Sequence, residues 1–259
     1  MAAPVSETSE APLVRRFQLE VACDTVDDAI EAAAGGADRI ELCTALDLGG
    51  LTPSPGLFHE AWTAIQLPIW LMIRPRPGDF VYSPSEVQVM ARDIELFRHA
   101  APTGFVFGVL DAEGRVNREA CSELLEACGD SPAVFHRAFD RTPNVPEALL
   151  ALIRLGFRRV LTSGREHTAH EGAKLIARMR ERSAGRIEVL PCGKVRADDL
   201  ETLLRVTGCD QVHGSFAEPV PTGDGAGFRG YPGRTRASRE QVAAARAELD
   251  RIASLSSSP

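Results

Sequence analysis

The sequence has the composition of a globular protein with an acidic balance of charge. Of its 259 residues, 44% are hydrophobic and 25% are charged, and 29 Lys and Arg against 36 Asp and Glu give a formal net charge of −7. This balance supplies no broad cationic surface for nucleic acid or anionic lipid. We therefore expect neither nucleic-acid nor membrane binding, and favour a small molecule or a metal ion as partner.

The N-terminal segment and the cysteines predict a cytoplasmic protein. The first fourteen residues lack a basic start followed by an apolar core, and no later apolar stretch reaches the roughly 18 to 20 residues that span a bilayer. The six cysteines, at positions 23, 43, 121, 128, 192 and 209, form no Cys-x-x-Cys pair. A disulfide framework and a tetrahedral zinc cluster are both poorly supported, so reduced thiols are expected.

The chain is predicted to hold one folded domain between two short tails. Residues 1–15 are rich in Ala, Pro, Ser and Glu, and residues 256–259 are mostly Ser, so both are expected to be disordered. The folded part is expected to cover residues 16–255.

Eight short apolar runs alternate with segments of helical spacing along this domain. The runs cover residues 16–23, 38–44, 69–75, 104–110, 133–140, 158–164, 186–193 and 209–216. Helical spacing is found at 25–36, 85–100, 118–128, 146–155, 169–182, 198–206 and 238–255. This alternation predicts an α/β fold, a (β/α)8 TIM-type barrel, with a doubly wound open sheet as the alternative.

Two loops stand out from the regular pattern. Residues 217–237 are rich in Gly and Pro, which predicts a long mobile loop before the last helix. The loop at 49–56 contains Ser54 and Pro55, a typical helix start. It could close over a ligand or expose amides to an anion, with an ordinary turn as the alternative.

Charged residues gather at the ends of the apolar runs, where burial is costly unless the charge is paired or used on a ligand. Strand alternation predicts which of these side chains point into the barrel. The inward set is Glu20, Glu41, Cys43, Arg74, His136, Gln211, His213 and Ser215. Because βα loops build the sites of such barrels at the carboxyl ends of the strands, we expect these residues to meet there.

The inward set predicts a site for an anion and for proton transfer. Arg74, with Arg76 or Arg137, could hold an anionic group, while Glu41, His136 or Asp140 could move a proton. The predicted ligand-binding residues are Glu20, Arg74, Arg76, Arg137, Ser163 and His213. The alternative is that these charges merely satisfy one another in a buried network.

Cys23 and Cys43 end adjacent strands, and two thiolates there would suit Cu(I). Alternation, however, sends Cys23 outward with Leu19 and Val21, opposite to Cys43, unless the strand end is twisted or bulged. Buried structural cysteines are the other interpretation.

Several long motifs resemble those of the copper homeostasis protein CutC family. They are GADRIELC at 36–43, GGLTPS at 49–54, MIRPR at 72–76, GDFVYS at 78–83, FHRAFD at 135–140 and RVLTSG at 159–164. The resemblance implies a TIM-type barrel, usually a homo-oligomer in the cytoplasm, with a role in copper tolerance and with Cys23 and Cys43 as copper ligands. The chain departs from the family at 191–195, where PCGKV replaces a loop that commonly contains three glycines.

Two hypotheses follow for the function. The first is a cytoplasmic copper-binding protein of the CutC type that holds Cu(I) by thiolates at the barrel mouth. The second is a TIM-barrel enzyme, a lyase, isomerase or hydrolase, that acts on a small anionic metabolite.

Overall fold

The computed structural model describes residues 17–220 and 234–255. The two predicted tails, 1–15 and 256–259, lie outside the described residues. So do residues 221–233, the middle of the predicted loop.

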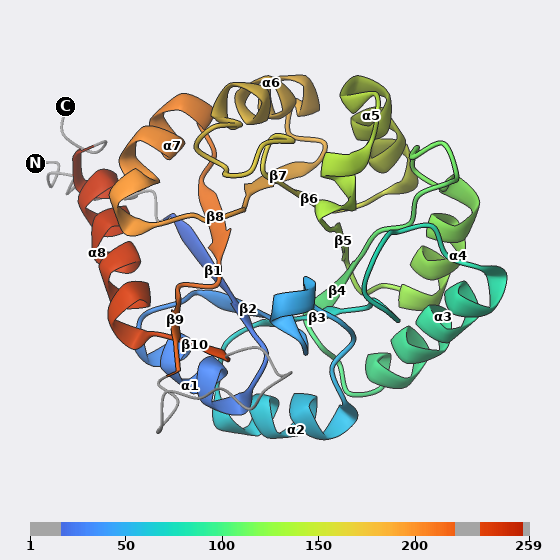
Figure 1. Ribbon diagram of the computed structural model, residues 1–259, viewed down its shortest axis with the longest axis horizontal. Helices are drawn as coiled ribbons and strands as arrows, with labels where there is room; N and C mark the ends of the chain where they lie inside the picture. The colour runs from blue at the N-terminus through green and yellow to red at the C-terminus, as the bar shows by residue number, and fades with distance from the viewer. Residues whose placement is uncertain (1–16, 221–233, 256–259) are drawn as a thin grey trace, which may run out of the picture.

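Eight parallel strands form a barrel (Figure 1). They are β1 Gln18–Cys23, β2 Arg39–Leu42, β3 Ile69–Met72, β4 Gly104–Phe107, β5 Ala133–Phe135, β6 Arg159–Thr162, β7 Glu188–Pro191 and β8 Gln211–Gly214. The order of pairing is β7-β6-β5-β4-β3-β2-β1-β8, and β7 and β8 lie near each other so that the ring is nearly closed. The predicted (β/α)8 barrel is confirmed.

The helices lie outside the strands, and most begin at a side-chain cap. They are α1 Val26–Ala34, α2 Pro55–Ala64, α3 Pro84–Arg98, α4 Arg118–Cys128, α5 Val145–Leu155, α6 Ala173–Ser183, α7 Leu200–Thr207 and α8 Arg239–Leu255. Thr25, Ser54 and Ser83 each accept a hydrogen bond from the first turn of their helix, which satisfies amides that have no partner within the helix. The helix start predicted at Ser54 is thus confirmed.

Two predicted segments differ from the structure in ways that bear on the site. The run at 133–140 ends as a strand at Phe135, because His136 caps the 3-10 helix η2, Arg137–Arg141. The segment 217–237 contains strands at both ends, β9 Ala217–Pro219 and β10 Thr235–Ala237, which pair in antiparallel fashion.

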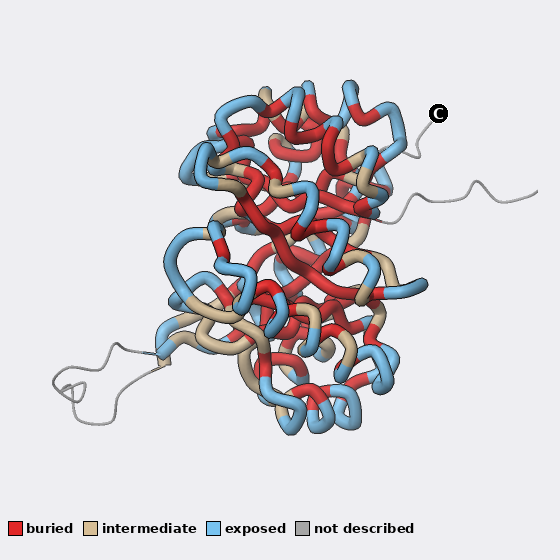
Figure 2. Tube along the Cα trace, turned by 90° about the vertical axis from the view of Figure 1, so that its right-hand side faces the viewer, coloured by how far each residue is buried: buried red, intermediate tan, exposed pale blue. Residues whose placement is uncertain are grey.

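The apolar core has two parts, one on each side of the barrel wall. The larger part lies between strands and helices, and the smaller one fills the barrel interior. Figure 2 shows this buried material running through the middle of the molecule, with exposed residues confined to its periphery. Within 17–220 and 234–255, no helix has the length and apolar character needed to cross a membrane.

Candidate functional site at the barrel mouth

The polar residues inside the barrel form two groups at different heights. The group that we call the ionic layer comprises Glu20 with residues that start four strands: Arg39, Arg159, Glu188 and Gln211. The second group lies at the carboxyl ends of the strands, at the barrel mouth, and comprises Glu41, His136 and His213.

The ionic layer is a connected network of hydrogen bonds and ion pairs. Arg39 donates to Glu20 and, at 2.7 Å, to Oε1 of Gln211. Arg159 contacts Glu20 at 3.4 Å and Glu188 at 2.9 Å, and its guanidinium lies 4.9 Å from the ring centre of Trp70. The sequence interpretation missed Arg39, Arg159 and Glu188, although the same alternation that points Glu20 and Glu41 inward also covers them.

The network fixes Glu20 as an anion. Burial alone would raise the pKa of this carboxyl, but Arg39, His213 and Arg159 together hold the pKa well below its ordinary value of 4.5. Glu20 is therefore charged near neutral pH.

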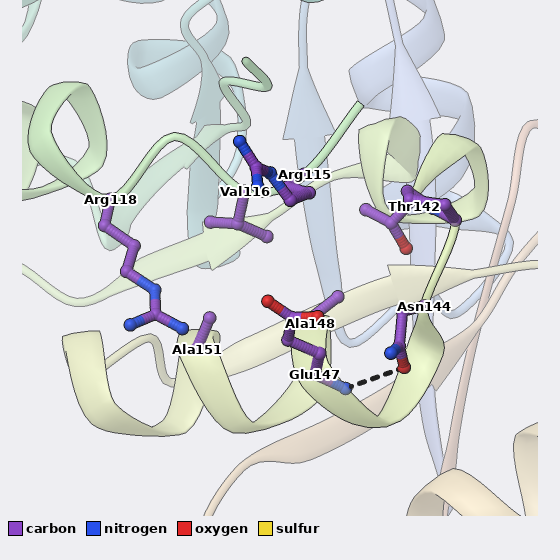
Figure 3. A pocket seen from close by; sticks show the side chains of 9 residues that line it. Arg115, Val116, Arg118, Thr142, Asn144, Glu147, Ala148 and Ala151 are labelled. Carbon is purple, nitrogen blue, oxygen red and sulfur yellow. Dashed lines mark hydrogen bonds between the residues drawn. The ribbon is translucent and has the colours of Figure 1, made fainter. Parts of the chain in front are cut away.

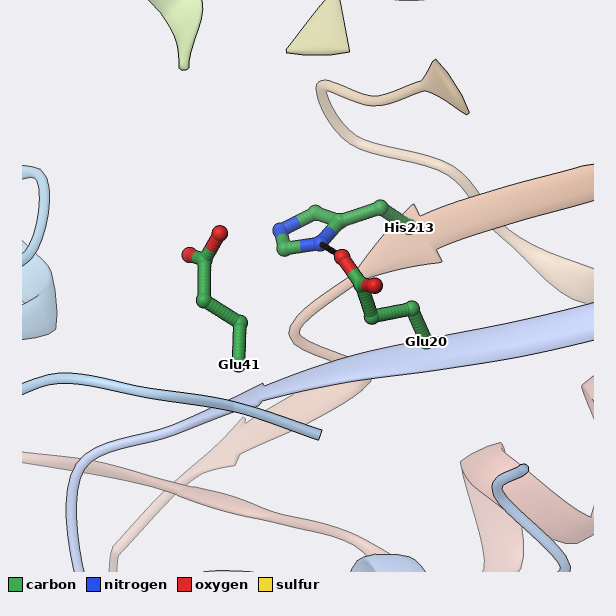
Figure 4. A group of neighbouring side chains, drawn as sticks. All are labelled: Glu20, Glu41 and His213. Atoms are coloured by element: carbon green, nitrogen blue, oxygen red, sulfur yellow. Dashed lines mark hydrogen bonds and ion pairs between the residues drawn. The ribbon is translucent and has the colours of Figure 1, made fainter. Parts of the chain in front are cut away.

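His213 lies between Glu20 and Glu41 (Figure 4). Its Nδ1 is 2.8 Å from Oε1 of Glu20, and each of the three residues offers a ligand atom within 4.8 Å of the others. Burial would lower the pKa of His213, but the two carboxylates outweigh it and raise this pKa. The ring thus bridges one fixed anion and one second carboxyl group.

Glu41 is the least satisfied carboxyl group of the barrel. Within the described residues, its buried Oε2 has no hydrogen-bond partner. Burial raises its pKa to about 7, against a smaller lowering by His213 and a further raising by Glu20. Glu41 can therefore gain or lose a proton near neutral pH, which general acid and base catalysis requires.

His136 contributes a neutral imidazole. Burial, with the positive charge of Arg74, lowers its pKa to about 3. Its Nδ1 accepts the amide N–H of Ala138 at 3.2 Å, whereas the buried Nε2 meets no partner in the part of the chain that the structure describes.

A pocket of about 240 Å³ lies among these groups. Glu41, His136 and His213 all line it, together with the cationic residues Arg137 and Lys194. The loop after β7, Cys192 to Lys194, and the end of β8 with the residue after it, His213 to Ser215, supply much of its wall. Its volume is below the roughly 300 to 1,000 Å³ that is usual for drug-sized ligands, so it suits a small metabolite.

A second recess lies between the start of α5 and the segment that leads into α4 (Figure 3). Asn144, Glu147 and Arg115 are among its lining residues, and its volume is about 20 Å³. That is room for about one water molecule, so this recess is not a candidate site.

Arg74, which the sequence predicts to bind an anion, uses its guanidinium for hydrogen bonds to backbone carbonyls of two loops. Its Nη1 donates to the carbonyls of Leu48 and Gly50 at 2.9 and 3.1 Å, and Nη2 donates to that of Gly78 at 2.9 Å. These contacts hold the loops after β2 and β3 against the mouth. Arg76 lies at the surface, where it pairs with Asp79 and Glu86.

Asp140 and Ser163 join η2 to the end of β6. Asp140 accepts hydrogen bonds from Thr162 Oγ1, from the amide and hydroxyl of Ser163, and from Arg165 N, and it pairs with Arg137 at 3.1 Å. Both carboxylate oxygens are thus occupied. These contacts position Arg137 beside the pocket, and a role of Asp140 in proton transfer stays a prediction.

Cys23 and Cys43 belong to different parts of the core. Cys23 packs with Leu19 and Val21 outside the barrel wall, whereas Cys43 packs inside it with Met72. Burial, and then the nearby carboxylates, raise the pKa of both thiols well above the ordinary value. In this arrangement, the two residues do not fit a metal site that uses both sulfurs as thiolates.

Known proteins are similar to this chain in both sequence and fold. The human copper homeostasis protein cutC homologue is 43% identical over 206 residues, which cover 80% of this chain and 76% of that protein. A CutC family protein of Rhizobium meliloti (strain 1021) is 41% identical over 91% of this chain and 97% of its own length. The crystal structure of a CutC protein from Streptococcus agalactiae matches with a TM-score of 0.74 and 32% identity, covering 77% of this chain and 98% of that one. The model of the CutC family matches residues 17–218, and the chain therefore belongs to the CutC family.

Proposed function

We propose that the barrel mouth is the active site of an enzyme that transfers protons on a small anionic metabolite. The observation that carries this proposal is the position of His213, whose ring lies between Glu20 and Glu41 beside a pocket. A buried histidine with a fixed carboxylate on one nitrogen is the arrangement that orients catalytic imidazoles in many enzymes.

The hydrogen bonds of His213 indicate the roles of Glu20, His213 and Glu41. Because Glu20 remains ionised, it accepts the N–H of Nδ1, which leaves Nε2 as the basic nitrogen of the neutral ring. Nε2 lies on the side of Glu41 (Figure 4). The pKa of Glu41 is raised to about 7 and that of His213 is raised as well, so near neutral pH one of the two groups can act as base and the other as acid.

The pocket wall supports an anionic substrate. Arg137 and Lys194 line it, and both are cationic donors suited to phosphate or carboxylate groups. Leu46, Met72 and Phe80 supply an apolar wall that suits a short carbon skeleton.

A metabolite screen with matched histidine variants tests this proposal. Small phosphorylated and carboxylated metabolites are screened for turnover by NMR, first with the unaltered chain. For a substrate found in this way, His213→Gln is expected to lower kcat by roughly 10²- to 10⁴-fold with little change in KM.

The control is His99→Gln, which alters an exposed histidine at the end of α3 and is expected to change neither constant. Absence of turnover across the panel, or turnover that His213→Gln leaves intact, would contradict the proposal.

Copper binding is the second candidate, because the human relative is named for copper homeostasis. One observation favours the pair Cys23 and Cys43: the amide N of Cys43 donates to the carbonyl O of Cys23 at 3.0 Å, so the two residues are neighbours. Cysteine is a preferred ligand of Cu(I). Binding by both sulfurs would require one side chain to turn to the other face of the sheet.

An anaerobic Cu(I) titration against a chromophoric chelator tests this candidate. Binding by both sulfurs predicts that Cys23→Ser and Cys43→Ser each abolish stoichiometric binding, while Arg74→Ala retains it. The control is the double variant Cys121→Ser, Cys128→Ser, which alters two buried thiols of α4. Stoichiometric Cu(I) retained by the double variant of Cys23 and Cys43 would exclude this pair.

A cytoplasmic location and assembly into a homo-oligomer remain predictions. All six cysteines lie in the described part of the chain, are buried and take part in no disulfide, which is consistent with a reducing compartment.

A further inference from the structure

The imidazole of His136 lies beside the pocket, with Nδ1 hydrogen-bonded and Nε2 buried without a partner in the described part of the chain. His136 follows β5 and caps η2, where Nδ1 accepts the amide N–H of Ala138. The side chain is 5% exposed and lines the same pocket as Glu41 and His213.

This hydrogen bond decides where the ring carries its proton. A neutral imidazole has one N–H, and Nδ1 acts as an acceptor, so the proton is on Nε2. Among residues 17–220 and 234–255, no acceptor lies within hydrogen-bond distance of this buried N–H. A buried donor is costly to leave unsatisfied, so a ligand atom that accepts this hydrogen bond would gain from it.

The surrounding residues keep the ring in place. A Cβ on Gly108 would lie 2.6 Å from Nδ1 of His136. Only glycine at position 108 leaves room for the imidazole in this position. The ring of Phe80 lies 4.9 Å from that of His136 between centroids, and the guanidinium of Arg74 lies 5.1 Å from the ring centre of Phe80. The positive charge of Arg74 further disfavours protonation of His136.

We propose that Nε2–H of His136 binds the carbonyl oxygen of the substrate, and that the substrate is a small anionic aldehyde or ketone with a C–H bond next to the carbonyl group. This inference rests on the function proposed for His213 and Glu41, and it adds the class of substrate and a third catalytic residue. A neutral donor suits a developing oxyanion because it stabilises negative charge without giving up its proton.

The step balances without any further reactant. Nε2 of His213 takes the proton from the carbon next to the carbonyl, and the electron pair of that C–H bond forms a C=C bond. The π pair of the carbonyl moves onto oxygen, where Nε2–H of His136 donates a hydrogen bond to it. Return of a proton to the same carbon restores the substrate. Where that carbon also bears a hydroxyl group, the hydroxyl proton moves to the former carbonyl oxygen, the former carbonyl carbon takes the proton held by His213, and a new C=O forms at the deprotonated carbon, which gives the isomeric hydroxy carbonyl compound.

Hydrogen exchange into substrate from D2O tests the proposal without knowledge of the final product. The probes are dihydroxyacetone phosphate, 2-oxobutanoate and 2-oxoglutarate, and exchange of the C–H bonds beside the carbonyl is followed by proton NMR. We expect the protein to accelerate exchange of at least one probe, and His136→Asn to lower this rate by roughly 10²- to 10³-fold. Asn can still cap η2 through its side-chain oxygen, but it places no donor at the position of Nε2.

Two further readouts keep the test independent of folding. The ¹⁵N spectrum of the unaltered protein should show His136 protonated at Nε2 and not at Nδ1 across the neutral range, and protonation at Nδ1 would overturn the inference. Gly108→Ala, which displaces the ring and removes no functional group, should lower the exchange rate as well.

The outcomes separate this inference from the proposed function. Exchange that depends on His213 but is equal in folded His136→Asn overturns the role of His136 and leaves the proposed function standing. If no probe exchanges, the substrate class is overturned, and the metabolite screen with His213→Gln decides the proposed function by itself.

Discussion

Glu20 and Glu41 lie on neighbouring strands and both face the barrel axis, yet their pKa values are shifted in opposite directions. Glu20 lies among Arg39, Arg159 and His213, and its pKa is held well below the ordinary value. Glu41 lacks such guanidinium contacts within the described residues, and burial raises its pKa to about 7. Both carboxyl groups are buried, so their charged neighbours decide which of them can exchange a proton in the neutral range.

The same contrast holds for the two groups to which these residues belong. In the ionic layer, arginine, glutamate and glutamine side chains satisfy one another in a buried network. At the barrel mouth, Oε2 of Glu41 and Nε2 of His136 lack a partner in the described part of the chain. Buried polar groups are normally satisfied, so a ligand that pairs with these two atoms would be stabilised by them.

The largest expected effect is on the ionic layer. Arg159→Ala removes a buried guanidinium from Glu20 and Glu188, and we expect it to lower the free energy of unfolding by about 3 to 5 kcal/mol, because it leaves Glu20 with less compensation. Urea denaturation measures this change. Arg158→Ala is the matched control, since Arg158 also pairs with Glu188 but is 58% exposed, and its cost should not exceed about 1 kcal/mol. Equal costs for the two variants would show that the ionic layer is not structural.

The next effect concerns Glu41 and has a defined dependence on pH. Its folded pKa, about 7, lies above the ordinary 4.5, so its contribution to stability is fully present below 4.5 and is lost as the pH rises through 7. Glu41→Gln removes this loss. We expect the variant to gain about 2 to 3 kcal/mol relative to the unaltered chain between about pH 4 and about pH 8.5, as measured by urea denaturation at each pH.

An exposed carboxyl group provides the control for this pH dependence. Glu123→Gln, on the outer face of α4, should stay within about 0.5 kcal/mol of the unaltered chain at both pH values. A flat difference between Glu41→Gln and the unaltered chain would mean that burial does not raise the pKa of Glu41.

The smallest effect is expected for Arg76, which the sequence placed in the ligand-binding set. Its guanidinium is partly exposed, pairs with Asp79 and Glu86, and lies over the ring of Tyr82. Arg76→Ala should cost about 1 kcal/mol or less in urea denaturation. For any substrate of the barrel mouth it should leave KM unchanged, whereas a large rise in KM would restore Arg76 to the site.

The alternation of apolar runs with helical segments predicted the barrel, and the period of two within each strand predicted the direction of several site residues. Glu20, Glu41 and His213 face the barrel interior as predicted, and Cys23 faces outward. Alternation holds because the helices cover one face of each strand and the barrel interior lies at the other. Alternation does not apply to Asp140, because the strand ends at Phe135 and the chain turns into η2.

The partners of each charge could not be read from the sequence. Arg74 is buried at the mouth, but the carbonyls that it holds belong to loops whose path alternation does not describe. Likewise, the sequence does not separate Glu20 from Glu41, since one of the two guanidiniums that contact Glu20, that of Arg159, comes from a strand far along the chain.

The titration of Glu41 tests the central claim most directly. The side-chain carboxyl carbons of ¹³C-labelled protein are followed by NMR across the pH range, with Glu41→Gln used to assign the signal. The account predicts a midpoint for Glu41 near 7 and a linked change in the ring of His213, while Glu20 stays ionised throughout. A midpoint near the ordinary value of 4.5, with no response from His213, would contradict it.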